Sequence, residues 1–300
     1  GKVKAILPVH VAGQPCRMDA IVDIAQRFDL RIVEDAAHAL EAEIGLRLSA
    51  GGEERSVWRK VGTIGDATCF SFYATKNITT GEGGMVTTHN TKLAERIRCL
   101  ALHGLSRDAW KRYSGEGDWY YEIVEQGYKY NMPDILAALG LSQLQRVEQM
   151  HQTRCHLVGI YEKELQDIPE VILPRTHGNV KHAWHLYIMR LQTNLLTITR
   201  NKFVVRLKEA GIGTSVHFIP LHLHPYYQRR FGCKPGDHPV AERLYRSAIS
   251  LPLYPKLTEE QVHFVAAKVK QLIKENSKQT KFKGVDPRTF HSANFNEKAS

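Results

Sequence analysis

The stretch SFYATKNITTGEGGMV, residues 71–86, decides the fold of this chain because it places a lone lysine where a strand ends. Residues 67–72 form a short apolar segment, and Gly81, Gly83 and Gly84 mark a tight turn after Lys76. A lysine at a strand end, flanked by hydroxyl side chains, is placed like a Schiff-base lysine beside a phosphate site. A low-dielectric setting favours its neutral, nucleophilic amine. The alternative is an ordinary surface lysine in a flexible loop.

A second stretch, RIVEDAAHA at residues 31–39, argues against that alternative. Ile32 and Val33 predict a short buried strand, and Asp35 follows at its carboxyl end. The apolar spacing over 18–28 predicts a helix before it, and 5–11 predicts an earlier strand. The unit is therefore β-α-β, and ligands of open α/β sheets bind beyond the carboxyl ends of the strands.

A carboxylate at that edge suits a pyridinium nitrogen, because the ion pair keeps the nitrogen protonated and the ring an electron sink. Taken alone, Asp35 could equally cap the turn through Ala36 and Ala37. Together with Lys76 at the next strand end, it predicts a pyridoxal 5'-phosphate (PLP) site.

Three motifs in this order, VEDAAHA (33–39), GDATCFSFYATKNITTGEGG (65–84) and GYKYNMPDILAALGLSQL (127–144), resemble the sugar-nucleotide aminotransferases of the DegT family. The resemblance covers roughly residues 5–274. It implies an α/β fold of the PLP-transferase type (fold type I), with a mixed sheet and flanking helices in a large domain. A smaller α+β domain would follow.

The resemblance also implies roles for individual residues. Lys76 would carry the cofactor and Asp35 would pair with its pyridine nitrogen. His38 would lie near the cofactor's O3′ and Ser71 would bind its phosphate. Asn131 would reach the phosphate from the partner subunit of a homodimer. His217 and Phe218, in GIGTSVHF (211–218), match a substrate-contacting segment of the family less tightly.

The chain departs from the family pattern at its start. The family's preceding segment, with a glycine-serine-threonine loop for the phosphate, does not appear, and the first residue is Gly1. We therefore expect this chain to be the C-terminal portion of a longer protein. A smaller departure is the stretch 45–60, which is longer and more charged than usual and predicts a surface loop.

We expect three segments: 1–168 as part of the large domain, 169–275 as the small domain, and 276–300 as a disordered polar tail. In the second, 184–191 and 213–218 predict strands. Thr199 begins a helix that ends before Gly211, and Thr258 with Gln261 forms a capping box. In the first, Pro133 opens a helix whose apolar stripe, with Ile135, Leu136, Leu139, Leu144 and Val147, is expected to lie in the core or in a dimer contact.

Composition fits a globular chain, with 43% hydrophobic and 24% charged residues. Five scattered cysteines without CxxC spacing indicate free thiols in a reducing compartment, and hence a cytoplasmic location. No apolar run approaches the ~20 residues of a membrane span. The net charge of +10 suggests nucleic-acid binding, but the basic residues are dispersed among acids, which favours a nucleotide-sugar substrate instead.

His217, His222 and His224 lie close together in HFIPLHLHP (217–225). Because no cysteine or carboxylate joins them in this stretch, we predict substrate contact or packing here and no metal site.

The sequence thus predicts a PLP-dependent aminotransferase that moves an amino group from an amino acid, glutamate by preference, to a keto sugar of a nucleotide-sugar. Two alternatives remain. PLP-dependent deoxysugar dehydratases of the same family carry histidine at the Schiff-base position, and Lys76 argues against that reaction. A cofactor-binding regulator, or an inactive fragment, would keep the motifs without turnover.

Overall fold

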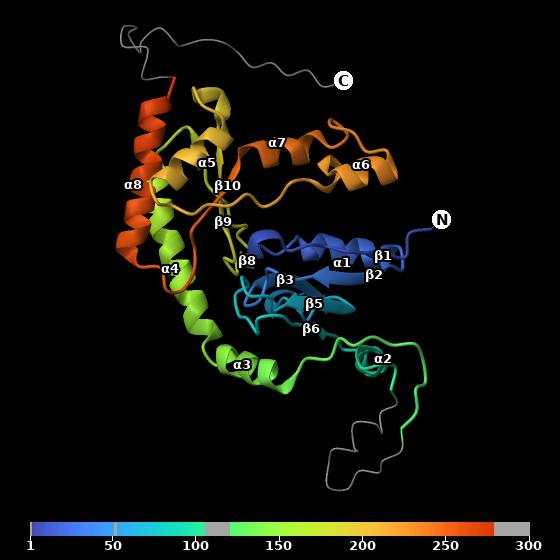
Figure 1. Ribbon diagram of the computed structural model, residues 1–300. Coiled ribbons are helices and arrows are strands. Elements are labelled where there is room, and N and C mark those ends of the chain that lie inside the picture. Colours follow the sequence, from blue (N-terminus) through green and yellow to red (C-terminus); the bar gives the residue numbers. More distant parts are fainter. Residues whose placement is uncertain (1, 51–52, 106–120, 279–300) are drawn as a thin grey trace. The chain divides into compact units, whose positions relative to one another are not determined.

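A computed structural model describes residues 2–50, 53–105 and 121–278 of the protein (Figure 1). The described chain divides into two compact units. The first comprises Gly1–Glu162, Pro174–Ile188 and Pro252–Val262, and the second Lys163–Leu173, Met189–Leu251 and His263–Ser300. Among the described helices, none is both long and apolar enough to cross a membrane.

The first unit is built on a four-stranded mixed sheet with the order β1-β2-β5-β6. β1 (Ala5–Ile6), β2 (Arg31–Asp35) and β5 (Ala67–Ser71) run parallel, and β6 (Gly84–Thr87) returns antiparallel to β5. Helix α1 (Met18–Arg27) makes the crossover between β1 and β2. The predicted β-α-β unit is confirmed. The first strand is shorter than predicted, because a short 3-10 helix (Val11–Gly13) already occupies its expected end.

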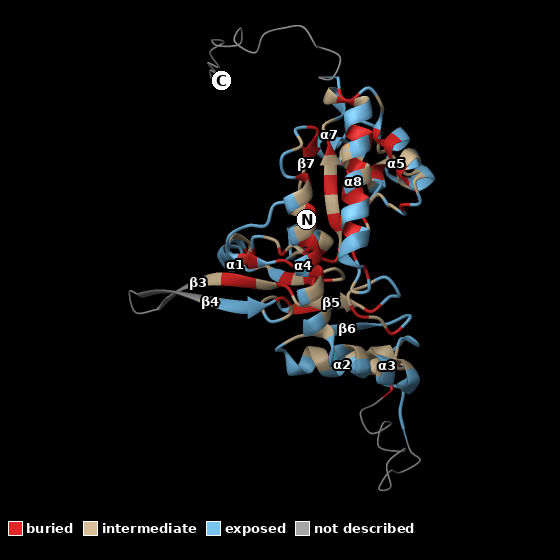
Figure 2. Ribbon diagram, turned by 90° about the vertical axis from the view of Figure 1, so that its left-hand side faces the viewer, coloured by how far each residue is buried: buried red, intermediate tan, exposed pale blue. Residues whose placement is uncertain are grey.

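The core of this unit lies between α1 and the sheet, because their apolar positions face one another. Met18 and Ala25 of α1 pack with Ile32 of β2 and with the alanines of the turn that follows it. Figure 2 shows the buried positions as red segments within otherwise tan and blue ribbons. Alanine at positions 36, 39 and 42 lets the turn after β2 lie close against the core.

Residues 45–60 are not a surface loop, and that prediction is wrong. β3 (Glu43–Ala50) and β4 (Glu53–Lys60) form an antiparallel hairpin, in register from Glu43 opposite Lys60 to Ala50 opposite Glu53. β8 (Val180–Lys181) adds to the other edge of β3. The sequence signal was the pair Gly51–Gly52 between the two strands, a two-residue connection that favours hairpins.

Three helices complete the described first part of the chain. The Asn90 side chain accepts the Leu93 N–H and caps α2 (Thr91–Ala101). α3 (Asp134–Leu144) begins after Pro133, which is its N-cap rather than its first helical residue. α4 (Val147–Leu165) follows almost directly. The predicted apolar stripe of α3 is not a core face, because Ile135 is 83% exposed and Leu139 is 42% exposed in the single chain.

The second unit is built on a three-stranded sheet of order β10-β9-β7, with β7 (Val171–Ile172) antiparallel to β9 (Tyr187–Leu191). The first two residues of β9 belong to the first unit. β10 spans Ala248–Leu251. Four helices accompany these strands: α5 (Arg200–Glu209), α6 (Pro225–Phe231), α7 (Pro239–Ser247) and α8 (Glu259–Asn276). Thr199 caps α5 as predicted.

Other predictions for this part of the chain need correction. The strand predicted over 213–218 is reduced to a single bridge between Ser215 and Ser250. The predicted disordered tail begins too early at 276, because Asn276 still ends α8 and Ser277 bridges Leu196. Residues 279–300 of that tail lie outside the described residues. The sequence also predicts a long polar loop over 102–127, of which 106–120 lie outside the described residues.

Gly13 is required by the backbone of the turn that precedes α1. Its φ is +97°, and an added Cβ would lie 2.8 Å from the His38 carbonyl oxygen and 3.1 Å from the His185 nitrogen. We expect Gly13→Ala to lower the free energy of unfolding by about 1–3 kcal/mol, measured by urea denaturation. Gly159→Ala in α4, where a Cβ meets nothing within 4 Å, is the matched control and should stabilise by up to about 1 kcal/mol. Equal changes in unfolding free energy for Gly13→Ala and Gly159→Ala would contradict the requirement for glycine at position 13.

Candidate active site

The carboxyl ends of β2 and β5 bring the two predicted catalytic residues to one edge of the sheet. Asp35 ends β2 directly opposite Cys69 of β5, and the Ala36 N–H donates to the Cys69 carbonyl at 2.9 Å. The Asp35 carboxylate accepts the Ala37 N–H at 3.0 Å. The carboxylate therefore caps the following turn and also lies at the site, so the two interpretations of Asp35 are compatible.

Lys76 lies close enough to Asp35 for their charges to interact. Burial lowers the pKa of the Lys76 amine, and the Asp35 carboxylate opposes this shift without cancelling it. The same carboxylate, together with burial, raises the pKa of the Cys69 thiol. A half-buried lysine with a lowered pKa is more readily neutral, as a nucleophilic amine must be.

The glycine turn after Lys76 is held by its own hydroxyl groups. The Thr79 hydroxyl donates to the Phe72 carbonyl and accepts the Gly81 N–H, and the Thr80 hydroxyl donates to the Glu82 carbonyl at 2.7 Å. A Cβ on Gly83 would lie 2.3 Å from the Thr80 hydroxyl oxygen, so this turn needs glycine. These threonine hydroxyls are engaged within the turn. Within the described residues, the one hydrogen bond of the Ser71 hydroxyl is a long one, 3.4 Å, which it accepts from the Tyr73 N–H.

His38 follows Asp35 on the turn after β2 and lies against a second histidine that we did not predict from the sequence. Its ring is 4.3 Å from that of His185, and its Nδ1 accepts the Ala12 N–H. Asn77, next to Lys76, contacts His185 Nδ1 at 3.0 Å and donates to the Ala183 carbonyl at 3.0 Å. Because Asn77 and His185 are distant in sequence, no local pattern could have indicated this pair. It anchors the lysine loop beside His38.

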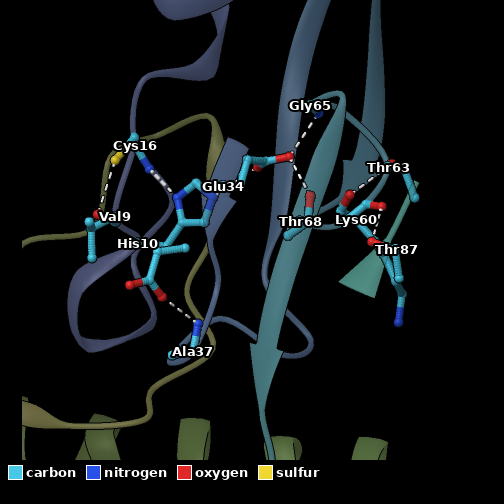
Figure 3. A network of polar contacts seen from close by, with 12 residues as sticks. Val9, His10, Cys16, Glu34, Ala37, Lys60, Thr63, Gly65, Thr68 and Thr87 are labelled. Carbon is cyan, nitrogen blue, oxygen red and sulfur yellow. Dashed lines mark hydrogen bonds and ion pairs between the residues drawn. The ribbon is translucent and has the colours of Figure 1, made fainter. Parts of the chain in front are cut away.

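A fully buried histidine–carboxylate pair involves Glu34, the neighbour of Asp35 on β2, and was also missed from the sequence (Figure 3). His10 Nε2 lies 2.9 Å from the Glu34 carboxylate, and both side chains are inaccessible to solvent. The Gly65 N–H and the Thr68 hydroxyl both donate to the other Glu34 oxygen at 2.8 Å. The Cys16 N–H donates to His10 Nδ1, so Nε2 carries the proton shared with Glu34. The available signal was period 2, since Glu34 shares the face of buried Ile32.

This network stabilises the end of β2, which carries Asp35. Besides its side-chain pair with Glu34, His10 donates its backbone N–H to the Asp35 carbonyl at 3.1 Å, and the Asp35 N–H donates to the Pro8 carbonyl at 2.9 Å. Burial would raise the pKa of Glu34, but the hydrogen bonds from His10, Gly65 and Thr68 outweigh it and hold the pKa below 4.5.

The remaining predicted site residues are placed as follows. Asn131 accepts a hydrogen bond from the Lys129 ammonium at 2.5 Å. Within the described residues it has no hydrogen bond to Lys76, Asp35 or Ser71. Its neighbour Met132 reaches the glycine turn at Gly83.

The two predicted substrate contacts belong to the second unit. His217 Nδ1 lies 2.7 Å from the Ser250 hydroxyl, and Phe218 is 59% exposed. Their rings contact edge to face.

The buried pair makes a testable contribution to stability. Glu34→Gln leaves the His10 Nε2–H without its carboxylate, so we expect a loss of about 3–5 kcal/mol of unfolding free energy near neutral pH. Because the folded pKa of Glu34 lies below its ordinary value of 4.5, its stabilisation is present above that pH and is lost as the pH falls through the folded pKa. Urea denaturation at a series of pH values measures both effects.

Glu209→Gln, in an exposed pair with Arg206, is the control and should cost less than about 1 kcal/mol. If the unfolding free energies of wild type and Glu34→Gln differed by a constant amount down to acid pH, the Glu34 carboxylate would not be the source of the stabilisation.

A mixed α/β sheet with a half-buried lysine and a carboxylate beyond adjoining strand ends is the arrangement expected of a PLP-dependent enzyme of fold type I. The chain belongs to the DegT/DnrJ/EryC1/StrS aminotransferase family, whose model matches residues 1–270. The family predicted from the three motifs is therefore confirmed.

Similar proteins agree with this assignment. The chain is 54% identical over 275 residues to the uncharacterized protein MJ1066 of Methanocaldococcus jannaschii, covering 92% of this chain and 68% of that protein. It is 47% identical over 274 residues to the spore coat polysaccharide biosynthesis protein SpsC of Bacillus subtilis, covering 91% and 67%.

A solved structure supports the fold and the cofactor. The PLP form of Spr1654 from Streptococcus pneumoniae superposes with a TM-score of 0.77 at 30% identity, covering 91% of this chain and 69% of that one. The predicted fold class and cofactor are confirmed. The chain spans about two thirds of the length of these relatives.

Proposed function

We propose that this protein transfers an amino group from an amino acid, glutamate by preference, to the keto carbon of a nucleotide-linked sugar. The observation that carries the proposal is the Lys76 amine, with its lowered pKa, beside Asp35 in a chain of this aminotransferase family. A role in the biosynthesis of a polysaccharide or another amino-sugar product is supported by the 47% identity to SpsC.

The residues of the site fit the cofactor. Asp35 would hold the pyridine nitrogen protonated, Lys76 would attach the cofactor, His38 would lie near its O3′, and Ser71 would bind its phosphate through a hydroxyl that has only one long bond. When bound, the cofactor supplies an electron sink for the carbon that loses its proton. Lys76 Nζ would then move that proton between Cα of the donor and the cofactor carbon C4′.

The location of the other proposed contacts is consistent with a homodimer. Asn131 would bind the phosphate of the cofactor in the neighbouring subunit. The stripe of α3, with exposed Ile135 and Leu139 and half-buried Leu136, would be buried in the interface. His217 and Phe218 would contact the sugar substrate. Neither nucleic acid nor membrane is a proposed partner. Free cysteines at all five positions support a cytoplasmic location.

Two alternatives are less well supported. A deoxysugar dehydratase of the family would carry histidine in place of Lys76. An inactive regulator has no need for an amine whose pKa is lowered toward neutrality, as burial does for Lys76.

Replacing Lys76 tests the proposal directly. We expect Lys76→Ala to lose the visible absorbance of bound cofactor and the mass increase that borohydride reduction leaves on wild-type protein, because the Lys76 amine, which interacts with Asp35, is the proposed attachment point. Lys92→Ala, an exposed lysine on α2, is the matched control and should retain both. In wild type, glutamate should abolish the absorbance band. A mass increase that persists in Lys76→Ala would mean that the cofactor is attached to another residue.

Mixing two inactive variants tests the shared site. Lys76→Ala and Asn131→Ala homodimers should each be inactive, while mixed dimers contain one site with both residues intact and should recover up to about a quarter of wild-type activity by random exchange of subunits. Turnover is measured with glutamate and a keto-sugar nucleotide. With subunit exchange shown separately by native mass spectrometry, absence of recovery would mean that Asn131 does not act across an interface.

A further inference from the structure

The second unit contains a hollow whose lining is strongly basic. It has a volume of about 770 Å³ and lies between the end of β9 and helix α7. Three guanidinium groups line it, those of Arg190, Arg243 and Arg246, together with polar groups of Gln192, Thr193 and Ser247. The volume is within the roughly 300–1,000 Å³ of small-molecule sites.

The carboxylate that lines this hollow already has partners for both of its oxygens. Among the described residues that line it, Glu242 is the one carboxylate. One of its oxygens contacts His222 Nε2 at 3.0 Å and accepts the Gly236 N–H, and the other accepts Arg246 at 2.6 Å. Within the described residues, neither Arg190 nor Arg243 has an ion pair. The lining therefore carries an uncompensated positive charge.

A second hollow of about 470 Å³ adjoins the first, since Thr193 and Arg246 line both. Arg200 lines it and is only 5% exposed. Its guanidinium donates to the Ala248 carbonyl at 3.1 Å and lies 4.9 Å from the Tyr245 ring centre. Its Nε is buried without a hydrogen-bond partner, and no carboxylate pairs with it in the described part of the chain. A buried guanidinium without an anion is costly, which favours an anionic ligand here.

We propose that the two joined hollows bind a small ligand carrying a diphosphate, of the nucleoside diphosphate class. Arg190 and Arg243 would hold one phosphate and Arg200 with Arg246 the other, because guanidinium groups bind phosphate oxygens through paired, charge-assisted hydrogen bonds. The hydroxyl and amide groups of the first hollow would contact the rest of the ligand. This site goes beyond the proposed transamination, since none of the residues assigned to cofactor or substrate lines either hollow.

The test uses inorganic pyrophosphate and uridine diphosphate with the whole chain, saturated with PLP, at physiological ionic strength. Pyrophosphate carries no nucleoside that the proposed sugar-nucleotide site could bind, so its affinity decides the outcome. Isothermal titration calorimetry measures binding to wild type and to the double variant Arg190→Gln/Arg243→Gln. Both arginines are outside the buried core, and thermal melting verifies that the variant folds. We expect at least about tenfold weaker binding of both ligands, because each lost charge-assisted hydrogen bond accounts for about that factor.

The matched control is Arg229→Gln/Arg230→Gln. It removes the same charge from exposed positions of α6, outside both hollows. It should bind both ligands like wild type. If the two double variants lost affinity equally, the binding would come from the general attraction of a basic protein for anions, and the proposed site would be wrong. Unchanged affinity in Arg190→Gln/Arg243→Gln, or no binding by wild type, would overturn it as well.

Discussion

The parallel pairing of β2 with β5 is the constraint on which the site depends. It sets Asp35 opposite Cys69, so that the carboxylate ending one strand and the loop leaving the next meet at the same sheet edge. Lys76 follows β5 after a short turn, and its amine is therefore close enough to Asp35 for their charges to interact. Any slip of one residue in this pairing would exchange the faces of β2 and carry Asp35 to the buried side.

The neighbouring carboxylates of β2 show how strand geometry assigns opposite roles to adjacent residues. Glu34 points into the core, where His10, Gly65 and Thr68 satisfy its oxygens. Asp35 lies on the opposite face of the strand, toward the site, and its carboxylate accepts the Ala37 N–H. The buried carboxylate joins β5 and the chain before α1 to β2. It thereby holds in place the strand end from which the other carboxylate acts.

Charge is distributed differently in the two units. In the first, ionisable groups near the sheet occur as satisfied sets, such as His10 with Glu34. In the second, arginines from β9, α5 and α7 gather around adjoining hollows with one engaged carboxylate among them. The net charge of +10 therefore reflects local structure as well as a generally basic surface. On helix α7, Glu242 and Arg246 are four residues apart and pair on one face, whereas Arg243 follows Glu242 directly and points away from it.

The sequence alone determined the β-α-β unit, the family and the identity of Lys76 and Asp35, because apolar periodicity and glycine turns are local properties. Only the tertiary structure decided which distant groups meet: Asn77 with His185, His10 with Glu34, and the arginines of the second unit. It also turned the expected loop over 45–60 into a hairpin and left the stripe of α3 exposed. The physical reason is that side-chain partners and burial depend on contacts between segments far apart in the chain, which local patterns do not contain.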